Sequence, residues 1–194
     1  MKLIIANPIK STSNTMIAAK MTFALASELL GLDKYSDKAV VVMFDRDMGN
    51  IARERISRRQ DAVWGGTDQK FDEQGIIRVV LAMIPEFPRQ MMTSLLHELK
   101  HVEQTASGVS VQHDDGSVTW KGKRHSAIVE EATGFNELAD KIGKNQDAYT
   151  NAPWEVDARA FAKMAAPILD QRAADGGLVE VVDEDGYTVH KRVL

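Results

Sequence analysis

The residues most able to do chemistry in this chain lie in the segment His97-Glu98-Leu99-Lys100-His101, which has the pattern His-Glu-x-x-His. Residues four apart lie on one face of a helix, so His97 and His101 can present two imidazole nitrogens to one metal ion. Glu98 lies outside that pair, where its carboxylate can accept a proton from metal-bound water. The spacing predicts a catalytic metal site. The alternative is an amphipathic helix in which the three residues occur together by chance.

A third protein ligand is needed, because catalytic zinc normally has three and keeps one position open for water. The chain has no cysteine, which excludes thiolate ligands and disulfides. The metzincin pattern is also excluded, because Gln104 and Ser107 stand where it has glycine and a third histidine. Two carboxylates on later predicted helices remain as candidates, Glu137 and Glu155. His113, near the tip of a predicted hairpin, is a weaker one.

Several short segments carry a resemblance to a known family. The residues around Glu137, Gly-Phe-Asn-Glu-Leu-Ala-Asp, resemble the Asn-Glu element of gluzincin peptidases, but their second acidic residue comes three positions after the glutamate instead of four. The match is better for a set that comprises residues 97–104, a hairpin ending in Trp-Lys-Gly at 120–122, Tyr149, and Pro-Trp-Glu-Val-Asp-Ala at 153–158. This set resembles small gluzincin-like zinc peptidase domains of bacterial and phage genomes. The resemblance covers about residues 76–166.

The resemblance implies an α+β, zincin-like fold: a small mixed sheet, an active-site helix and a later helix that carries the third metal ligand. It makes Glu155 the third ligand of one zinc ion, beside His97 and His101, with Glu98 as general base. Tyr149 becomes a donor to the oxyanion of the tetrahedral intermediate. The implied substrate is a peptide or protein. Relative to that family, residues 123–148 look like an inserted helix.

Composition is that of a soluble globular protein. The 194 residues are 44% hydrophobic and 27% charged, with a net charge of −4. We expect a single domain over residues 1–194, in which residues 1–75 are scaffold of unassigned role. The net charge gives no reason to expect nucleic acid, and no apolar run is long enough for a membrane span. The N-terminus lacks a signal peptide's long apolar region, so we expect a cytoplasmic protein, or a virion-associated one if it is phage-encoded.

Hydrophobic periodicity and turn residues predict the secondary structure. Residues 49–75 have no clear periodicity. Their arginine cluster, Arg53, Arg55, Arg58 and Arg59, is interpreted as a solvated helix face, and residues 64–67 are interpreted as a turn. The strand at 76–84 precedes the metal helix, and an exposed edge there could hold an extended peptide. The expected helices are 15–30, 88–105, 126–142 and 152–166, the last bent at Pro167. The expected strands are 1–8, 39–44 and 76–84, with hairpins at 109–121 and 178–193.

The hypothesis with the most support is a zinc metallopeptidase in which metal-activated water attacks a peptide bond. Two alternatives remain open. One is a catalytically silent structural or binding protein of a phage or cellular assembly, which uses residues 1–75 for docking. The other is an amidase that acts on cell-wall peptides with the same zinc chemistry. Oligomeric state stays open.

Overall fold

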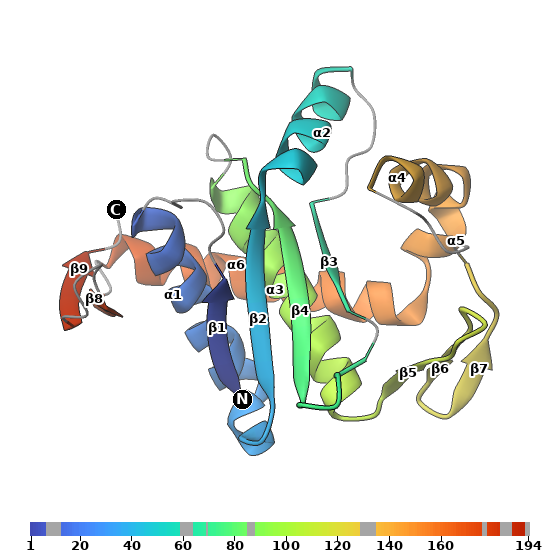
Figure 1. The fold of residues 1–194 in the computed structure, drawn as a ribbon, viewed down its shortest axis with the longest axis horizontal. Helices are drawn as coiled ribbons and strands as arrows, with labels where there is room; N and C mark the ends of the chain where they lie inside the picture. The colour runs from blue at the N-terminus through green and yellow to red at the C-terminus, as the bar shows by residue number, and fades with distance from the viewer. Residues whose placement is uncertain are drawn as a thin grey trace.

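The centre of the molecule is a four-stranded mixed sheet with the order β1-β2-β4-β3 (Figure 1). The computed structural model describes residues 1–6, 13–58, 64–68, 70–84, 88–128, 135–175, 178–182 and 188–192. Strands β1 (Lys2–Ala6), β2 (Ala39–Asp45) and β4 (Ile76–Ala82) are parallel. The short strand β3 (Gly65–Thr67) runs antiparallel to β4. The expected α+β class and small mixed sheet are confirmed.

One face of this sheet is buried, because side chains on a strand alternate between its two faces. In β2 the buried residues Val40, Val42 and Phe44 alternate with partly exposed ones. Val40 and Val42 pair in register with Ile77 and Val79 of β4, which are also buried. The β-branched residues therefore form a continuous apolar surface on which helices can pack.

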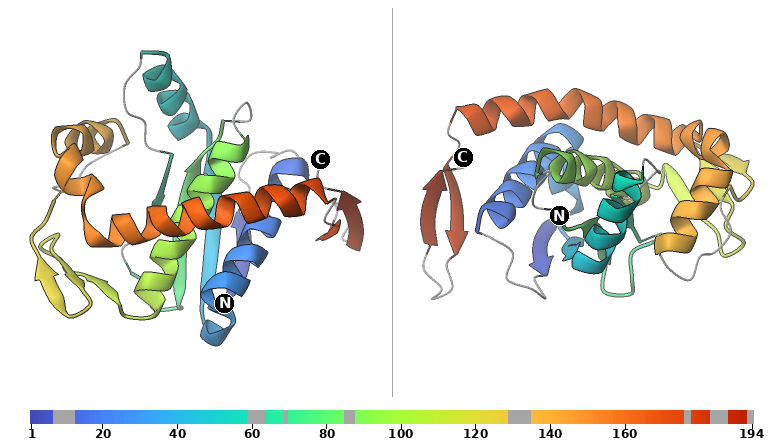
Figure 2. Two further views of the ribbon diagram at one scale, coloured as in Figure 1. Left: turned by 180° about the vertical axis from the view of Figure 1, so that it is seen from behind. Right: turned by 90° about the horizontal axis from the view of Figure 1, so that it is seen from above.

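Three helices form two layers over the buried face of the sheet (Figure 2). Helices α1 (Ser13–Leu30) and α3 (Pro88–Ala106) lie next to the strands, and α6 (Pro153–Ala174) crosses over both. Helix α3 therefore lies between the sheet and α6. Its residues Leu95, Leu96 and Leu99 are completely buried and join the main hydrophobic core. The helix that carries the His-Glu-x-x-His segment is thus held rigidly from two sides.

The remaining elements surround these layers (Figure 1). Helix α2 (Arg46–Ser57) follows β2 directly, and the Asp45 carboxylate caps it by accepting a hydrogen bond from the Met48 amide at 2.7 Å. The other elements are η1 (Leu32–Tyr35), the antiparallel sheet of β5 (Ser110–Gln112), β6 (Val118–Trp120) and β7 (Lys123–His125), α4 (Phe135–Lys144), α5 (Gln146–Thr150), and the hairpin of β8 (Leu178–Val182) and β9 (Thr188–Arg192).

Several expected boundaries are wrong. Residues 64–67 are not a turn, because Gly65–Thr67 pair with β4 as β3, and residues 49–75 also contain most of α2. Ser126 starts no helix: residues 126–128 are not helical, 129–134 lie outside the described residues, and α4 begins at Phe135. Helix α6 was expected to bend or restart at Pro167 toward Arg172; it continues through Pro167 to Ala174, and Ala165, Ile168 and Leu169 pack on the core on both sides of the proline.

Two smaller differences follow from pairing between strands. Strand β4 ends at Ala82, two residues before the expected end, and the basic residues Lys123–His125 pair with β6 as β7. The tip of the C-terminal hairpin at 183–187 lies outside the described residues. Within the part of the chain that the structure describes, no helix is both long and apolar enough to cross a membrane.

Candidate metal centre

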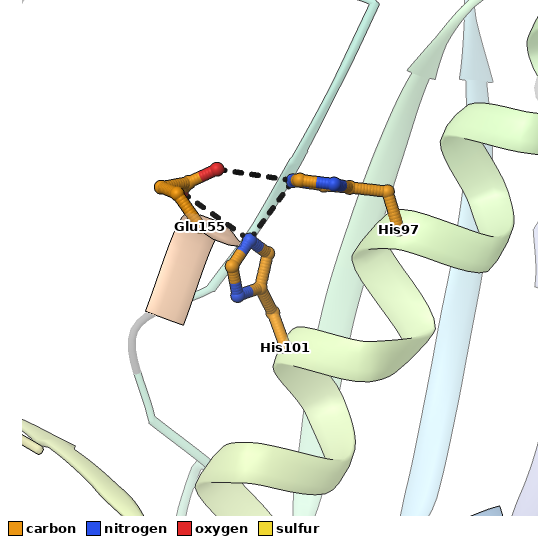
Figure 3. Close-up of side chains that lie close together, drawn as sticks. All are labelled: His97, His101 and Glu155. Atoms are coloured by element: carbon orange, nitrogen blue, oxygen red, sulfur yellow. Dashed lines mark hydrogen bonds and ion pairs between the residues drawn. The ribbon is translucent and has the colours of Figure 1, made fainter. Parts of the chain in front are cut away.

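Three side chains from two helices converge at one point (Figure 3). His97 and His101 lie one turn apart on α3, and their Nε2 atoms are 3.0 Å from each other. Glu155, in the first turn of α6, places Oε2 3.2 Å from Nε2 of His97 and Oε1 3.3 Å from Nε2 of His101. Among the described residues, this is the one group of histidine and carboxylate side chains that could hold a metal ion.

The separations within this group fit a small tetrahedral ion. Zinc binds imidazole nitrogen and carboxylate oxygen at about 2.0–2.1 Å, and at tetrahedral angles this places neighbouring ligand atoms about 3.3 Å apart. The Nε2–Nε2 separation of 3.0 Å, and the distances of 3.2 and 3.3 Å from these nitrogens to the two different carboxylate oxygens of Glu155, are close to that value. Two imidazoles and one carboxylate, without thiolate, also form a known set of catalytic zinc ligands. The residues present therefore fit a bound zinc ion.

Burial and charge favour a cation beside Glu155. Glu155 is 5% exposed; burial raises the pKa of its carboxyl, but hydrogen bonds from His101 and His97 outweigh burial and hold that pKa well below its usual range. Burial lowers the pKa of His101, but the hydrogen bond and charge of Glu155 raise it to about 9. When no metal is bound, a proton on His101 therefore balances the negative charge of the Glu155 carboxylate. A bound metal ion would take the place of that proton.

Gln104 fixes the orientation of His101. Its amide nitrogen donates to the Trp154 carbonyl at 3.1 Å and to Oδ2 of Asp157 at 2.9 Å, so its carbonyl oxygen faces His101. That oxygen accepts a hydrogen bond from Nδ1 of His101 at 2.8 Å. With the proton on Nδ1, Nε2 is left to bind a metal. Gln104 is 1% exposed, so its hydrogen bonds to Trp154 and Asp157 also tie α3 to α6 inside the protein.

Glu98 lies beside the metal group but is not part of it. Its side chain is almost buried, at 7% exposed, and lines the same cleft as His97 and Glu155. The carboxylate accepts a short hydrogen bond of 2.6 Å from the Thr67 hydroxyl of β3. The sequence analysis gave Glu98 the role of proton acceptor outside the ligand set, and this position is compatible with that role.

A cleft of about 630 Å³ opens at the site. Tyr149 of α5 lines it; burial and the nearby charges of Glu155 and Glu98 raise the pKa of its phenol well above 10.0. The phenol therefore keeps its proton at neutral pH and can donate a hydrogen bond. Arg159, one turn after Glu155 on α6, also lines the cleft; it approaches Glu155 to 3.9 Å and donates to the Thr150 carbonyl.

The other predicted candidates lie elsewhere. Glu137 pairs with Lys141 at 2.9 Å within α4 and is not a member of the metal group. His113, in the β5–β6 hairpin, bonds instead to the Thr119 hydroxyl at 2.8 Å. The described arginines of the cluster have protein partners: Arg53 donates to Asn50 at 3.0 Å within α2, and Arg58, just after α2, pairs with Glu54 at 2.6 Å, whereas Arg55 pairs with Asp140 of α4 at 3.0 Å.

Gln104, Thr67 and Arg159 contact residues of the site without having been predicted from the sequence. A signal for Gln104 was available, because it follows His101 by three positions and so lies on the same helix face. No local pattern pointed to Thr67, since its contact with Glu98 joins residues separated by 31 positions.

Comparison with protein-family models, with curated proteins and with solved structures gave no match to this chain. The functional assignment therefore depends on the residues and the geometry of the site.

Proposed function

We propose that this protein is a zinc-dependent metallopeptidase. The observation that carries the proposal is the convergence of His97, His101 and Glu155, at separations that suit a tetrahedral ion, in a cleft that Glu98 also lines. A structural zinc site would be closed by a fourth protein ligand, whereas this group has three members and faces a cleft. The arrangement of helices over a mixed sheet is compatible with the zincin-like fold expected from the sequence.

The chain's own residues have distinct roles in this proposal. His97, His101 and Glu155 hold the ion, which when bound lowers the pKa of a coordinated water and polarises a carbonyl group. Glu98 accepts a proton from the attacking water and returns it to the leaving amine. Tyr149 donates a hydrogen bond to the developing oxyanion, since its phenol stays protonated.

An extended peptide has a place to bind at the edge of the sheet. The expectation that residues 76–84 provide this edge is wrong, because β4 pairs with β2 on one side and β3 on the other. Among the described strands, β3 pairs with β4 alone, so its second edge is unpaired. Backbone hydrogen bonds to an exposed strand are a common way to hold an unfolded peptide segment. Strand β3 therefore replaces β4 as the proposed binding edge.

The proposal is tested by measuring metal content and peptide hydrolysis for the wild type and Glu98→Gln, both prepared without chelator. We expect about one zinc ion in each protein, and a loss of turnover of at least about 100-fold in Glu98→Gln, because general base catalysis contributes factors of that size. Casein and purified peptidoglycan serve as parallel substrates. Turnover of peptidoglycan alone would indicate an amidase. A wild type without zinc, or without turnover on either substrate, would contradict the proposal and favour the structural alternative.

A further inference from the structure

Strand β3 holds two of its three residues against the Glu98 side chain. Side chains two apart on a strand share a face, and Gly65 and Thr67 both face α3. The Thr67 hydroxyl donates to Oε2 of Glu98 at 2.6 Å and lies 3.4 Å from the Glu98 carbonyl oxygen. These contacts restrain the carboxylate that would act as the base.

Gly65 makes room for that carboxylate. A Cβ atom built on Gly65 would lie 2.9 Å from Oε1 of Glu98 and 3.0 Å from its Cγ, too close for any real side chain without displacement. A Cβ atom on the next residue, Gly66, would meet nothing within 4 Å. The backbone dihedrals of these two glycines do not require glycine, because neither has a positive φ. The Cβ atom on Gly65 would also lie 3.0 Å from Cδ2 of Leu81. Close approach to Glu98 and Leu81 is therefore the structural reason for glycine at position 65.

The same two residues form the unpaired edge of the strand. The amide of Ala82 donates to the Trp64 carbonyl and the amide of Asp68 donates to the Arg78 carbonyl, each at 2.9 Å. In an antiparallel pair, backbone groups alternate between facing the partner and facing away. The N–H and C=O groups of Gly65 and Thr67 therefore face away from β4, towards the edge on which a peptide would lie.

We infer that β3 is a positioning element for the general base: the Thr67 hydroxyl orients the Glu98 carboxylate, and the absence of a side chain at Gly65 leaves the space that it occupies. This inference rests on the proposed function for the role of Glu98. It also implies that the strand that binds the substrate and the strand that positions the base are the same.

Four variants test the inference in a peptide hydrolysis assay. Thr67→Val removes the hydroxyl at nearly constant shape, and Thr67→Ser restores it. Gly65→Ala places a methyl group against Glu98, and Gly66→Ala is the matched control that makes the same change towards open space. We expect Thr67→Val and Gly65→Ala to lower kcat about 100-fold, the cost of a base displaced by about 1 Å. Thr67→Ser should stay near the wild-type value, and Gly66→Ala, at a residue whose backbone groups face β4, should lower kcat far less than Gly65→Ala.

Two further readouts separate positioning from a general loss of structure. Zinc content and KM should be unchanged in Thr67→Val, because neither the ligands nor the backbone of β3 is altered. The inference would be overturned if Thr67→Ser lost as much kcat as Thr67→Val. It would also be overturned if Gly66→Ala lost as much kcat as Gly65→Ala.

A double-mutant cycle tests the contact without turnover. In metal-free protein, Thr67→Val should lower the urea midpoint of unfolding in the wild-type background but not in Glu98→Ala, where its hydrogen-bond partner is absent. An equal decrease in both backgrounds would show that Thr67 does not act through Glu98. A wild type that hydrolyses no peptide would overturn the role of Glu98 as base, and the cycle would still decide whether β3 holds the carboxylate.

Discussion

At the scale of single residues, the candidate metal centre is a buried carboxylate that needs a positive partner. An isolated ionised carboxylate is costly to bury, yet Glu155 is 5% exposed and its pKa is held below its usual range by the two histidines. The first turn of α6 adds the positive end of the helix dipole. These features favour a cation between Glu155 and the imidazole nitrogens, and a doubly charged metal ion satisfies them better than a proton.

Gln104 is the residue on which the orientation of His101 depends most. We expect Gln104→Leu to lower zinc affinity about 10-fold to 100-fold, because it removes the acceptor for Nδ1 of His101 and the hydrogen bonds from Gln104 to Trp154 and Asp157 of α6. The dissociation constant is measured by competition with a chromophoric chelator. Gln171→Leu, the same change at an exposed residue of α6, should bind zinc like the wild type. Unchanged affinity in Gln104→Leu would mean that core packing alone orients His101.

At the scale of elements, the site exists because α6 crosses α3. Two ligand atoms come from successive turns of α3 and the third from the start of α6. Lys100 of α3 reinforces the crossing: it pairs with Asp157 of α6 at 3.3 Å as well as with Glu103 at 2.9 Å. The metal centre is thus part of the interface between two helices rather than a feature of one.

This geometry predicts which carboxylate the metal requires. Glu155→Gln preserves the shape of the side chain but removes its charge, and we expect it to lose most of the zinc that co-purifies with the wild type. Glu137→Gln makes the same change in α4, where Glu137 pairs with Lys141, and should retain wild-type zinc. Metal content is measured by mass spectrometry on proteins prepared without chelator. Zinc lost from Glu137→Gln instead would move the third ligand to α4.

At the scale of the whole molecule, the three layers make metal binding a contribution to stability. Helix α3 contacts both the sheet and α6, so an ion that joins α3 to α6 binds only when these layers are assembled. A ligand that binds the native state alone, at 100 times its dissociation constant, raises the free energy of unfolding by about 2.7 kcal/mol. For a chain of this size we expect zinc to raise the melting temperature by about 5–10 °C over metal-free protein.

Differential scanning calorimetry checks this expectation, with metal-free protein titrated with zinc. The matched control is His97→Ala, which lacks one ligand and should show little or no shift with the same zinc additions. The same shift in His97→Ala would place the stabilising ion elsewhere, and the absence of a shift in the wild type would contradict the structural contribution of the site.

The sequence by itself determined the features that depend on neighbouring residues. The strands at 39–44 and 76–84, apart from the end of the second, and the helical character of residues 88–105 were predicted correctly, because β-branched residues favour strands and helical periodicity is a local property. For the same reason, the spacing of His97 and His101 was sufficient to predict that both face one point. These strands and helices and the candidate metal-binding segment therefore followed from short-range pattern, whereas the α+β class was expected from the family resemblance.

Only the tertiary structure decided which distant residues meet that segment. Glu137 and Glu155 both lie on helices after the motif, and the crossing of α6 over α3 brings Glu155 to the histidines. The segment at Gly65–Thr67 resembled a turn, since two glycines have no strand preference; pairing with β4 and the close approach of Glu98 made it a strand. Such contacts depend on how whole layers pack together, and that packing cannot be predicted from a local sequence pattern.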